Sequence, residues 1–347
     1  MKSIESLIQP HLLKLAPYSS ARDEFAGAAS VFLDANENPY GDPNGNDWNR
    51  YPDPHHMNLR QKLAQLKQVD PQQIFVGNGS DEAIELLIRL FCRPGQDNIL
   101  ITSPTYGMYK VSASINNVEV IEVSLREDYQ INVEDLLSAV TENTKLIFLC
   151  SPNNPTGNLL YAGDIQKVLD SFKGMVVVDE AYIDYAQSQS WVTKLAKNPN
   201  LIVLQTFSKA WGMAALRIGV AYASPEVVGY LNKIKPPYNV NAYTQQQALM
   251  ALENSARKDA MVEEGLQERQ QLANDLSALS LVEKIYPSDA NFILIKVKEA
   301  DALYEYLINQ QIVVRNRSKV HLCQGCLRIT VGTPEENKAL ISTLSSY

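Results

Sequence analysis

The sequence is short of the features that would place it in a membrane, on nucleic acid or in a disulfide-rich class. None of the apolar runs in its 347 residues approaches the roughly 20 residues of a membrane span. Lys and Arg number 31 against 39 Asp and Glu, and no stretch gathers enough cations to neutralise a phosphate backbone. We therefore expect neither a membrane nor a nucleic acid as partner. The charged start, Met1-Lys-Ser-Ile-Glu5, indicates no signal peptide and favours a cytoplasmic protein.

Cysteine is also scarce, with four residues at positions 92, 150, 323 and 326. Cys92 and Cys150 stand in apolar surroundings, which is typical of a cysteine that behaves as a small buried hydrophobe. Cys323 and Cys326 form a single CxxC near His321, but no second ligand pair accompanies them, and a structural zinc site normally has four ligands. The sequence therefore predicts neither a disulfide framework nor a metal site.

What the sequence does contain is a regular alternation of short apolar runs and longer amphipathic stretches. Such an alternation is typical of parallel strands joined by crossover helices. Ile84, Leu87, Ile88 and Phe91 recur at the spacing of one helix face. The region from about 75 to 225 therefore predicts an α/β domain around a mostly parallel sheet. Its strand-like runs are 99–101, 118–123, 146–149, 175–178, 201–204 and 218–222.

The C-terminal third of the chain has a different pattern. Residues 244–280 are rich in Gln, Glu, Ala and Leu and predict one long helix. Beyond them the sequence predicts strands at 291–297, 312–315 and 327–331 and a helix at 302–310. We expect a large domain over 36–250 and a smaller α+β unit made of 251–347 with the N-terminal segment 1–35.

Polar residues follow three of the predicted strands, at the edge where a parallel sheet collects its binding residues. These segments are Ser151-Pro-Asn-Asn154-Pro-Thr-Gly157, Asp179-Glu-Ala-Tyr182 and Thr206-Phe-Ser208-Lys209, and Arg217 follows eight residues after the lysine. Each residue alone has an ordinary structural explanation, such as a helix cap or a surface ion pair. Their joint placement at successive strand ends is harder to obtain by chance, so we expect them to converge.

The converging set matches what pyridoxal phosphate requires of a protein. Lys209 would form the covalent Schiff-base linkage and, once displaced by substrate, act as a free amine that moves a proton. Asp179 would face the ring nitrogen, where a carboxylate about 4 Å away contributes on the order of 4 kcal/mol toward the protonated ring at an effective dielectric of about 20. Asn154 and Tyr182 would hydrogen-bond the phenolic oxygen of the cofactor.

The cofactor phosphate also needs donors. The segment Gly77-Asn-Gly79-Ser80-Asp81 runs from a strand-like stretch into a helix start, where free backbone N–H groups can hold an anion. Ser208 and Arg217 would add side-chain donors, the arginine through a charge-assisted contact. Tyr106, in Ser103-Pro-Thr-Tyr-Gly107, would stack on the cofactor ring.

With these segments the sequence resembles the fold-type I pyridoxal-phosphate aminotransferases, and most closely the histidinol-phosphate aminotransferases. The resemblance spans most of the chain. It implies a large cofactor-binding α/β domain with a smaller α+β domain. It also implies transfer of the amino group of L-histidinol phosphate to 2-oxoglutarate, giving 3-(imidazol-4-yl)-2-oxopropyl phosphate and L-glutamate, in histidine biosynthesis. The further segments that carry it are Leu33-Asp-Ala-Asn36-Glu-Asn-Pro39, Arg50-Tyr51-Pro52, Gly79-Ser-Asp-Glu-Ala, Leu216-Arg-Ile-Gly and Leu327-Arg328-Ile-Thr-Val-Gly-Thr-Pro-Glu-Glu336.

The resemblance further implies a homodimer whose active site lies between the subunits. Tyr51 would then reach the cofactor phosphate of the neighbouring chain. The catalytic residues would be Lys209, Asp179 and Tyr182. The cofactor-binding residues that we expect are Gly79, Ser80, Asp81, Tyr106, Asn154, Asp179, Tyr182, Thr206, Ser208, Lys209, Arg217 and Tyr51.

For the substrate, the resemblance implies that Arg328 binds an anionic group and that Arg315 helps with the phosphate. Arg317 adds a second cation beside Arg315, so the sequence leaves open which of these two arginines meets the phosphate. Tyr18 and Asn36 are similar to family positions that line the substrate pocket. Arginine suits both the carboxylate of glutamate and a phosphate monoester, because its planar fork matches either anion.

Other functions remain open from the residues alone. A threonine-phosphate decarboxylase would share the cofactor and bind a phosphorylated amino compound. An aromatic or broad-specificity aminotransferase would share the reaction but act without a phosphate. A non-catalytic regulator that kept the domain is not expected, because about 35 residues before Asn36 are too few for a DNA-binding module and a linker.

Overall fold

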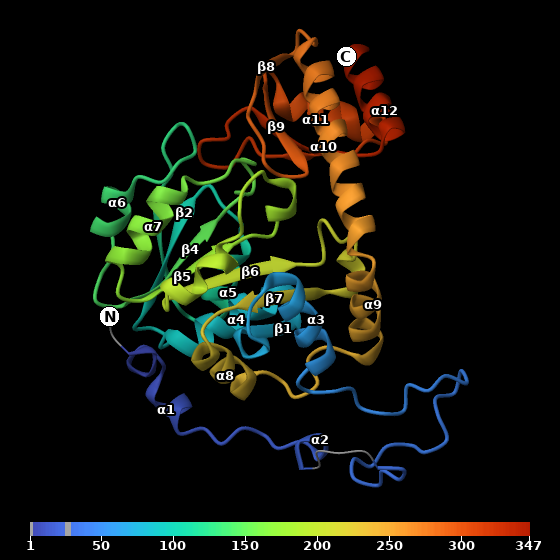
Figure 1. The fold of residues 1–347 in the computed structure, drawn as a ribbon. Coiled ribbons are helices and arrows are strands. Elements are labelled where there is room, and N and C mark those ends of the chain that lie inside the picture. Colours follow the sequence, from blue (N-terminus) through green and yellow to red (C-terminus); the bar gives the residue numbers. More distant parts are fainter. Residues whose placement is uncertain (1–2, 25–28) are drawn as a thin grey trace.

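A seven-stranded sheet forms the centre of the computed structural model, which describes residues 3–24 and 29–347 (Figure 1). The spatial order of its strands is β1-β7-β6-β5-β4-β2-β3, and β7 runs antiparallel to both of its neighbours. The mostly parallel sheet predicted from the sequence is therefore confirmed. The strands are β1 (Ile74–Asn78), β2 (Asn98–Ser103), β3 (Glu119–Ser124), β4 (Thr144–Cys150), β5 (Met175–Asp179), β6 (Leu201–Thr206) and β7 (Ile218–Tyr222).

Helices cover both faces of this sheet, because its central strands are apolar on both sides. In β4, Leu146 and Phe148 pack into one hydrophobic cluster, while Ile147 and Leu149 pack into the other. The first cluster is completed by α4 (Gly79–Phe91), α5 (Met108–Ile115) and α8 (Pro225–Ile234). The second is completed by α3 (Met57–Lys67), α6 (Val133–Ser138), α7 (Ala162–Ser171) and α9 (Ala242–Glu253).

The C-terminal unit contains a four-stranded antiparallel sheet of order β10-β11-β9-β8. A separate hydrophobic cluster joins this sheet to its helices. The α+β character predicted for the region is confirmed. The elements are α10 (Ser255–Ser277), β8 (Val282–Ile285), β9 (Phe292–Val297), α11 (Ala300–Asn309), β10 (Arg315–Asn316), β11 (Cys326–Thr330) and α12 (Pro334–Ser345).

Three details of this unit differ from the sequence prediction. The single helix expected over 244–280 is two helices, because the backbone leaves the helical region at Asn254 (φ −103°, ψ 30°). The strand expected at 312–315 is a two-residue strand that begins only at Arg315. Both β8, whose residues are half-buried or exposed, and α12 lie outside the predicted elements.

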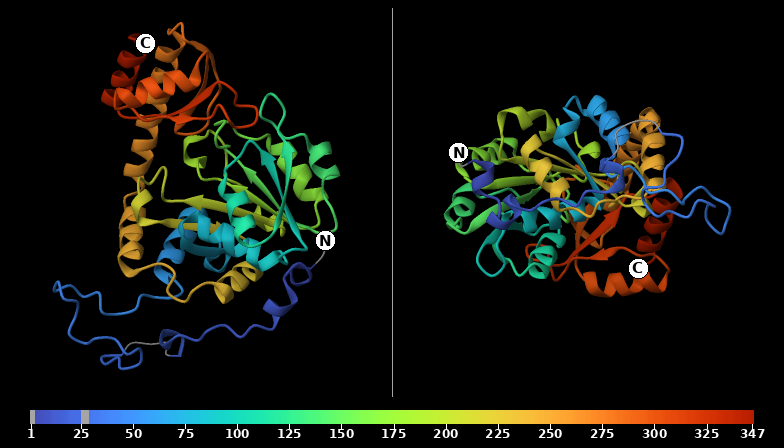
Figure 2. Two further views of the ribbon diagram at one scale, coloured as in Figure 1. Left: turned by 180° about the vertical axis from the view of Figure 1, so that it is seen from behind. Right: turned by 90° about the horizontal axis from the view of Figure 1, so that it is seen from below.

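The N-terminal segment packs on the large sheet unit at its start and then runs across the surface. Ile4, Leu7 and Ile8 are buried in the cluster of α4. The stretch that follows carries Leu33 and Tyr40, which are 91% and 92% exposed, and Figure 2 shows it extending along one side of the molecule, away from the C-terminal unit. The grouping of 1–35 with the C-terminal unit, and the division near residue 250, stay predictions. The short helices are η1 (Ile4–Ser6), α1 (Pro10–Leu13), α2 (Ala21–Glu24), η2 (Pro71–Gln73), η3 (Ile183–Tyr185), η4 (Trp191–Lys197) and η5 (Ala214–Leu216).

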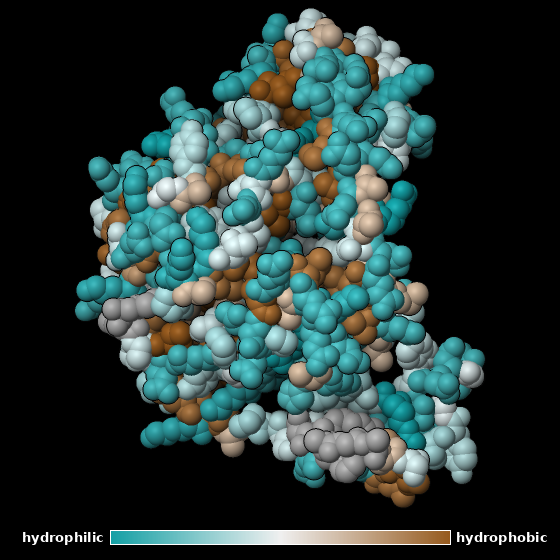
Figure 3. Space-filling view, viewed as in Figure 1, coloured by the Kyte–Doolittle hydropathy of each residue, from teal (hydrophilic) through white to brown (hydrophobic). Residues whose placement is uncertain are grey.

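Hydrophilic residues cover most of the face seen in Figure 3, and hydrophobic residues reach it in scattered areas. Scattered apolar residues are ordinary on the surface of a folded protein. Within the described residues, no helix is both long and apolar enough to cross a membrane.

Gly219 fixes how closely α4 can approach β7. A Cβ built on Gly219 would lie 2.0 Å from the backbone nitrogen of Ser80 and 2.2 Å from the carbonyl carbon of Gly79. These are backbone atoms at the start of α4, so they cannot move aside as the end of a flexible side chain would. The start of α4 is thus placed by a close contact that requires glycine on β7.

We expect Gly219→Ala to lower the free energy of unfolding by about 2 kcal/mol or more, as overpacking does when the backbone must shift. Urea denaturation of the purified protein measures this. Gly229→Ala in α8 is the matched control, because its Cβ would meet nothing within 4 Å, and a helical Gly→Ala change is neutral or stabilising by up to about 1 kcal/mol. Equal stability of Gly219→Ala and the wild type would contradict the prediction.

Candidate active site

The predicted residues meet at the edge of the large sheet where its parallel strands end. A cavity of about 660 Å³ opens there, between the sheet and the strands β10 and β11 of the C-terminal unit. Gly79 lies at the start of α4, directly behind it. The predicted residues that line the cavity are Ser80, Asp81, Tyr106, Asn154, Asp179, Tyr182, Thr206, Ser208, Lys209, Arg217, Arg315 and Arg328.

The reversed direction of β7 explains why Arg217 belongs to this edge. Arg217 immediately precedes β7, and Gly219 pairs with Thr206 at the end of β6. Arg217 adopts a left-handed backbone conformation (φ 54°), and its carbonyl accepts a hydrogen bond from the Gly79 N–H at 2.9 Å. Because an antiparallel strand starts where its neighbours end, its first residues face the same cavity as the carboxyl ends of the others.

Asp179 is the last residue of β5 and is 2% exposed. Its Oδ2 accepts a hydrogen bond from the Tyr109 hydroxyl at 2.6 Å, and its Oδ1 accepts one from the Ala181 N–H at 3.0 Å. Burial raises the pKa of the carboxyl to about 6, although both donors act in the opposite direction. The fold therefore places at the floor of the cavity a carboxyl group whose charged form is disfavoured by burial.

Lys209 lies on the other side of the cavity floor, three residues after β6. Its Nζ is 5.5 Å from the centre of the Tyr182 ring. Burial, and then the nearby guanidinium of Arg328, lower the pKa of the Lys209 amine. A lowered pKa makes the unprotonated, nucleophilic form of this amine more available.

An anion cradle lies between α4 and the loop after β6. Gly79 has φ +76°, and a Cβ on it would lie 2.6 Å from NH2 of Arg217, so a larger residue would displace the guanidinium. Arg217 donates to the Ser208 hydroxyl at 3.2 Å and forms an ion pair with Asp81 at 3.4 Å. The first turn of α4 adds backbone N–H groups that have no partner within the helix. The Asp81 carboxylate also accepts a bond from the Tyr106 hydroxyl at 3.1 Å.

The C-terminal sheet contributes three arginines to the opposite wall. Arg315 and Arg328 pair across β10 and β11, which places their side chains on the same face, and the Arg317 N–H bonds the Cys326 carbonyl at 2.9 Å. Burial and mutual repulsion lower the pKa of both Arg317 and Arg328. The Nε atoms of Arg317 and Arg328 are buried and have no partner among the residues that the structure describes. Such a wall fits an anionic ligand.

Asn154 connects the two sides of the cavity. Its Oδ1 accepts a short hydrogen bond from Arg328, and its Nδ2 donates to the Tyr182 hydroxyl at 3.5 Å. The Tyr182 ring packs edge-on against Phe292 with centroids 5.2 Å apart, and the Arg328 guanidinium lies 5.1 Å above the same Phe292 ring. The amide, the phenol and the guanidinium are thus held in one connected group.

Three predicted residues lie elsewhere in the single chain. Tyr51 is half-exposed and stacks on Tyr238 with ring centroids 4.5 Å apart. Tyr51 and Asn36 line a separate pocket of about 880 Å³, while Tyr18 is 73% exposed and lines a third pocket. The structure therefore does not bring these residues to the cavity of their own chain.

Sequence reasoning missed one residue of the site and left another undecided. Tyr109, three residues after Tyr106, donates to Asp179, but the sequence gives no sign that its hydroxyl faces a carboxylate. Arg317, left as an alternative to Arg315, lines the cavity together with it. The signal for Arg317 was available in the alternation of a strand, since residues 315 and 317 point to the same face.

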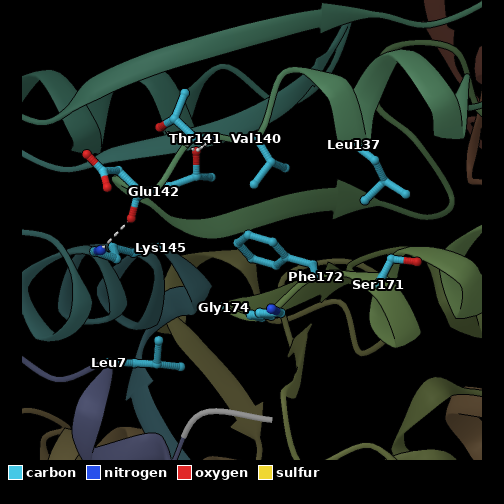
Figure 4. A pocket seen from close by; sticks show the side chains of 11 residues that line it. Leu7, Leu137, Val140, Thr141, Glu142, Lys145, Ser171, Phe172 and Gly174 are labelled. Atoms are coloured by element: carbon cyan, nitrogen blue, oxygen red, sulfur yellow. Dashed lines mark hydrogen bonds between the residues drawn. The ribbon is translucent and has the colours of Figure 1, made fainter.

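A further pocket, of about 340 Å³, lies on the far side of the sheet near the starts of β4 and β5 (Figure 4). Its lining combines apolar side chains such as Leu7, Leu137 and Phe172 with polar and charged ones, and Lys145 there donates to the carbonyl of Glu142 at 3.0 Å. None of the predicted site residues lines it. Among the residues that the structure describes, no three or more His, Cys, Asp or Glu side chains are grouped as metal ligands.

The raised pKa of Asp179 predicts how this carboxyl affects stability. Its folded-state pKa of about 6 lies above the unfolded value of about 4, so the native state binds more protons between these pH values and the protein loses stability as pH rises through them. In cofactor-free protein we expect Asp179→Asn to raise the free energy of unfolding by up to about 3 kcal/mol at pH 7.5. The gain should largely vanish at pH 4.5.

Urea denaturation at the two pH values measures this difference. Asp128→Asn is the matched control, because the Asp128 side chain is 54% exposed, with Arg126 at 3.4 Å and a hydrogen bond from the Gln130 N–H at 3.1 Å, so no comparable gain is expected. A wild type that is more stable than Asp179→Asn at pH 7.5 would show that the buried charge does not destabilise the empty protein.

The comparisons with known proteins agree with this geometry. The family model for aminotransferase class I and II matches residues 31–344. A histidinol-phosphate aminotransferase of Parabacteroides distasonis is 54% identical over 346 residues (100% of this chain, 99% of the relative), and one of Cytophaga hutchinsonii is 52% identical over 345 residues (99% of each). The solved structure of a histidinol-phosphate aminotransferase of Sinorhizobium meliloti in complex with pyridoxal-5'-phosphate has a TM-score of 0.78 at 25% identity, over 86% of this chain and 83% of that one. The chain belongs to the class I and II aminotransferases, which are pyridoxal-phosphate-dependent enzymes of fold type I, and within them to the histidinol-phosphate aminotransferases.

Proposed function

We propose that this enzyme transfers the amino group of L-histidinol phosphate to 2-oxoglutarate; its full-length relatives are named histidinol-phosphate aminotransferases. The observation that carries this proposal is the wall of three arginines from the C-terminal unit, which faces the buried Asp179 and Lys209 across one cavity. Both amino-group donors, histidinol phosphate and glutamate, bear an anion that such a wall can bind. Two half-reactions at one cavity predict ping-pong kinetics.

The residues of this cavity fit pyridoxal phosphate. The cradle of Gly79, Ser208 and Arg217 has room for an anion beside the first turn of α4, and the Asp179 carboxylate lies buried on the floor. Lys209 would hold the cofactor covalently, and Tyr106 would lie against its ring. When bound, pyridoxal phosphate supplies an electron sink for the bond at the substrate's α carbon.

Lys209 is the group that we expect to move the proton at that carbon. Once substrate has displaced it, its Nζ is a free amine, and the lowered pKa favours the form that can accept a proton. Asp179 would hold the ring nitrogen protonated through a charge–charge interaction in a water-poor site. Tyr182 and Asn154 would hydrogen-bond the phenolic oxygen of the cofactor, and the short bond from Arg328 orients the amide for that role.

The three arginines would bind different anionic groups of the substrates. Arg328, tied to Asn154 and close enough to Lys209 to lower the pKa of its amine, would bind the α-carboxylate of glutamate, an anion that histidinol phosphate does not have. Arg315 and Arg317, farther along the same wall, would bind the distal anion: the phosphate of histidinol phosphate or the side-chain carboxylate of glutamate. Tyr18 and Asn36 stay proposals for the substrate pocket.

A threonine-phosphate decarboxylase and an aromatic aminotransferase remain the alternatives. The first would act on phosphothreonine with release of carbon dioxide, and the second would not need a phosphate on its substrate. The aminotransferase reaction is favoured because relatives above 50% identity over the full chain carry that name. The identity of the substrate is therefore tested directly with a panel of compounds.

With 2-oxoglutarate as acceptor, we expect histidinol phosphate to form glutamate with a kcat/KM at least about 100-fold above that of phenylalanine or of unphosphorylated histidinol, because a missing phosphate removes the charge-assisted hydrogen bonds to Arg315 and Arg317. A panel of histidinol phosphate, histidinol, phosphothreonine and phenylalanine measures this. Histidinol is the matched control, since it lacks only the phosphate. Carbon dioxide release from phosphothreonine, without glutamate formation from histidinol phosphate, would establish the decarboxylase instead.

We also propose a homodimer in which Tyr51 completes the site of the neighbouring chain. Tyr51 lies outside the cavity of its own chain, beside a long surface segment that exposes Leu33 and Tyr40. Large apolar side chains that are almost fully exposed are expected to be covered by a partner when they lie together. A cytoplasmic location is part of the same proposal, since Cys92, Cys150 and the two thiols of the CxxC are all free, as is usual in a reducing compartment.

The dimer is tested by mixing two inactive variants, Tyr51→Phe and Lys209→Ala, under conditions that exchange subunits. If Tyr51 acts across the interface, each hybrid dimer has one intact site, and random exchange restores about a quarter of the wild-type sites. Mixing Tyr182→Phe with Lys209→Ala is the control, because these residues serve one chain's cavity and no hybrid site is intact. No gain over the unmixed variants would place Tyr51 outside the neighbouring site.

A further inference from the structure

Tyr109 occupies an unusual position between the two groups that would hold the cofactor ring. It is fully buried in α5, and its hydroxyl donates to Asp179 Oδ2 at 2.6 Å. Its ring stacks on Phe148 of β4 with centroids 4.8 Å apart, and the edge of its ring meets that of Tyr106 at 5.6 Å. One side chain thus contacts both the carboxylate on the floor and the tyrosine expected against the cofactor ring.

The hydrogen bonds of Asp179 determine what its carboxylate can do. Each carboxylate oxygen can accept about two hydrogen bonds. Tyr109 uses one position on Oδ2 and the Ala181 N–H uses one on Oδ1, so each oxygen keeps one position for a ligand. Donors on both oxygens also fix the plane of the carboxylate, because rotation about its bond would break both contacts.

The other groups around Asp179 stabilise its charged form less than the hydrogen bond from Tyr109 does. Burial raises the pKa of the carboxyl, and the charge of Asp81 acts in the same direction, whereas the hydrogen bond from Tyr109 is the largest contribution that lowers it. The attraction of Lys209 is smaller. The titratable and charged groups that face Asp179 are Tyr106 before α5, Tyr109 from α5, Asp81 from α4, Cys150 from β4, Tyr182 after β5 and Lys209 after β6.

We propose that Tyr109 is a positioning residue that keeps the Asp179 carboxylate ionised and oriented toward the cofactor ring. The phenol itself touches neither substrate nor cofactor in this role. It acts through Asp179, and through the packing of Tyr106 it sets the distance between the ring-stacking tyrosine and the carboxylate. The inference rests on the proposed role of Asp179 at the ring nitrogen.

The test compares pyridoxal phosphate affinity in wild type and Tyr109→Phe across pH 5 to 8.5, by equilibrium dialysis. The phenylalanine keeps the stacked ring and removes only the donor. Loss of a hydrogen bond to a charged group should raise the pKa of Asp179 by about one unit. The acid limb of the affinity profile, that is the pH range in which binding weakens with falling pH, should then shift to higher pH by about one unit. Binding should be about five- to tenfold weaker than in the wild type at pH 5–6 and near the wild-type value at pH 8.5.

Tyr222→Phe is the matched control, because Tyr222 is another fully buried tyrosine but lies outside the cavity; its profile should match the wild type. Tyr109→Met, a second donor-free variant, should show the same shift if the phenylalanine variant folds poorly. In protein that already carries Asp179→Asn, the Tyr109 variants should no longer shift the acid limb of the affinity profile. An unshifted limb in both Tyr109 variants overturns the proposal for Tyr109, whereas wild-type affinity in Asp179→Asn at every pH overturns the role of Asp179 itself.

Discussion

The buried charge of Asp179 is the constraint on which the rest of this active site depends. A carboxylate that loses its water must be compensated by donors or by an opposite charge. The fold supplies two donors, from Tyr109 and the Ala181 N–H, and these leave the pKa of the carboxyl raised. In our proposal the remaining compensation would come from the protonated ring of the cofactor, so the buried charge that destabilises the empty protein would also help to hold the cofactor. At this residue, the charge that favours cofactor binding therefore lowers the stability of the empty protein.

The topology brings residues of the two sheets to opposite walls of one cavity. The large sheet contributes the carboxylate, the lysine and the phosphate cradle, because the ends of its parallel strands and the start of β7 meet at one edge. The C-terminal sheet contributes arginines, because β10 and β11 pair Arg315 with Arg328. Neither sheet alone holds both the cofactor residues and the arginine wall. The reaction thus needs the two units of the chain together.

The parts of the site that the sequence predicted are those that follow strand ends. Asp179 and Lys209 could be placed because a parallel sheet brings successive carboxyl ends together, whatever the packing of its helices. Tyr109 could not, because the rotation of α5 about its axis decides which side chain faces Asp179, and that rotation depends on packing against β4. The break at Asn254 was also hidden, since local composition favours helix on both sides of it. Tyr51 lies outside the cavity of its own chain, and the role that we propose for it depends on a second chain, which local sequence patterns do not describe.

The arginine wall and the buried carboxylate explain how one cavity accepts two different amino donors. In our proposal the reacting end of either donor meets Lys209, while Asp179 acts through the cofactor ring, so the chemistry is common to both half-reactions. The distal anion differs in shape and charge between a phosphate monoester and a carboxylate. A pair of guanidinium groups, Arg315 and Arg317, can bind the dianion with both forks and the monoanion with one. Discrimination against unphosphorylated analogues would then follow from the loss of the charge-assisted contacts to these two guanidinium groups, whereas glutamate keeps such a contact through its side-chain carboxylate.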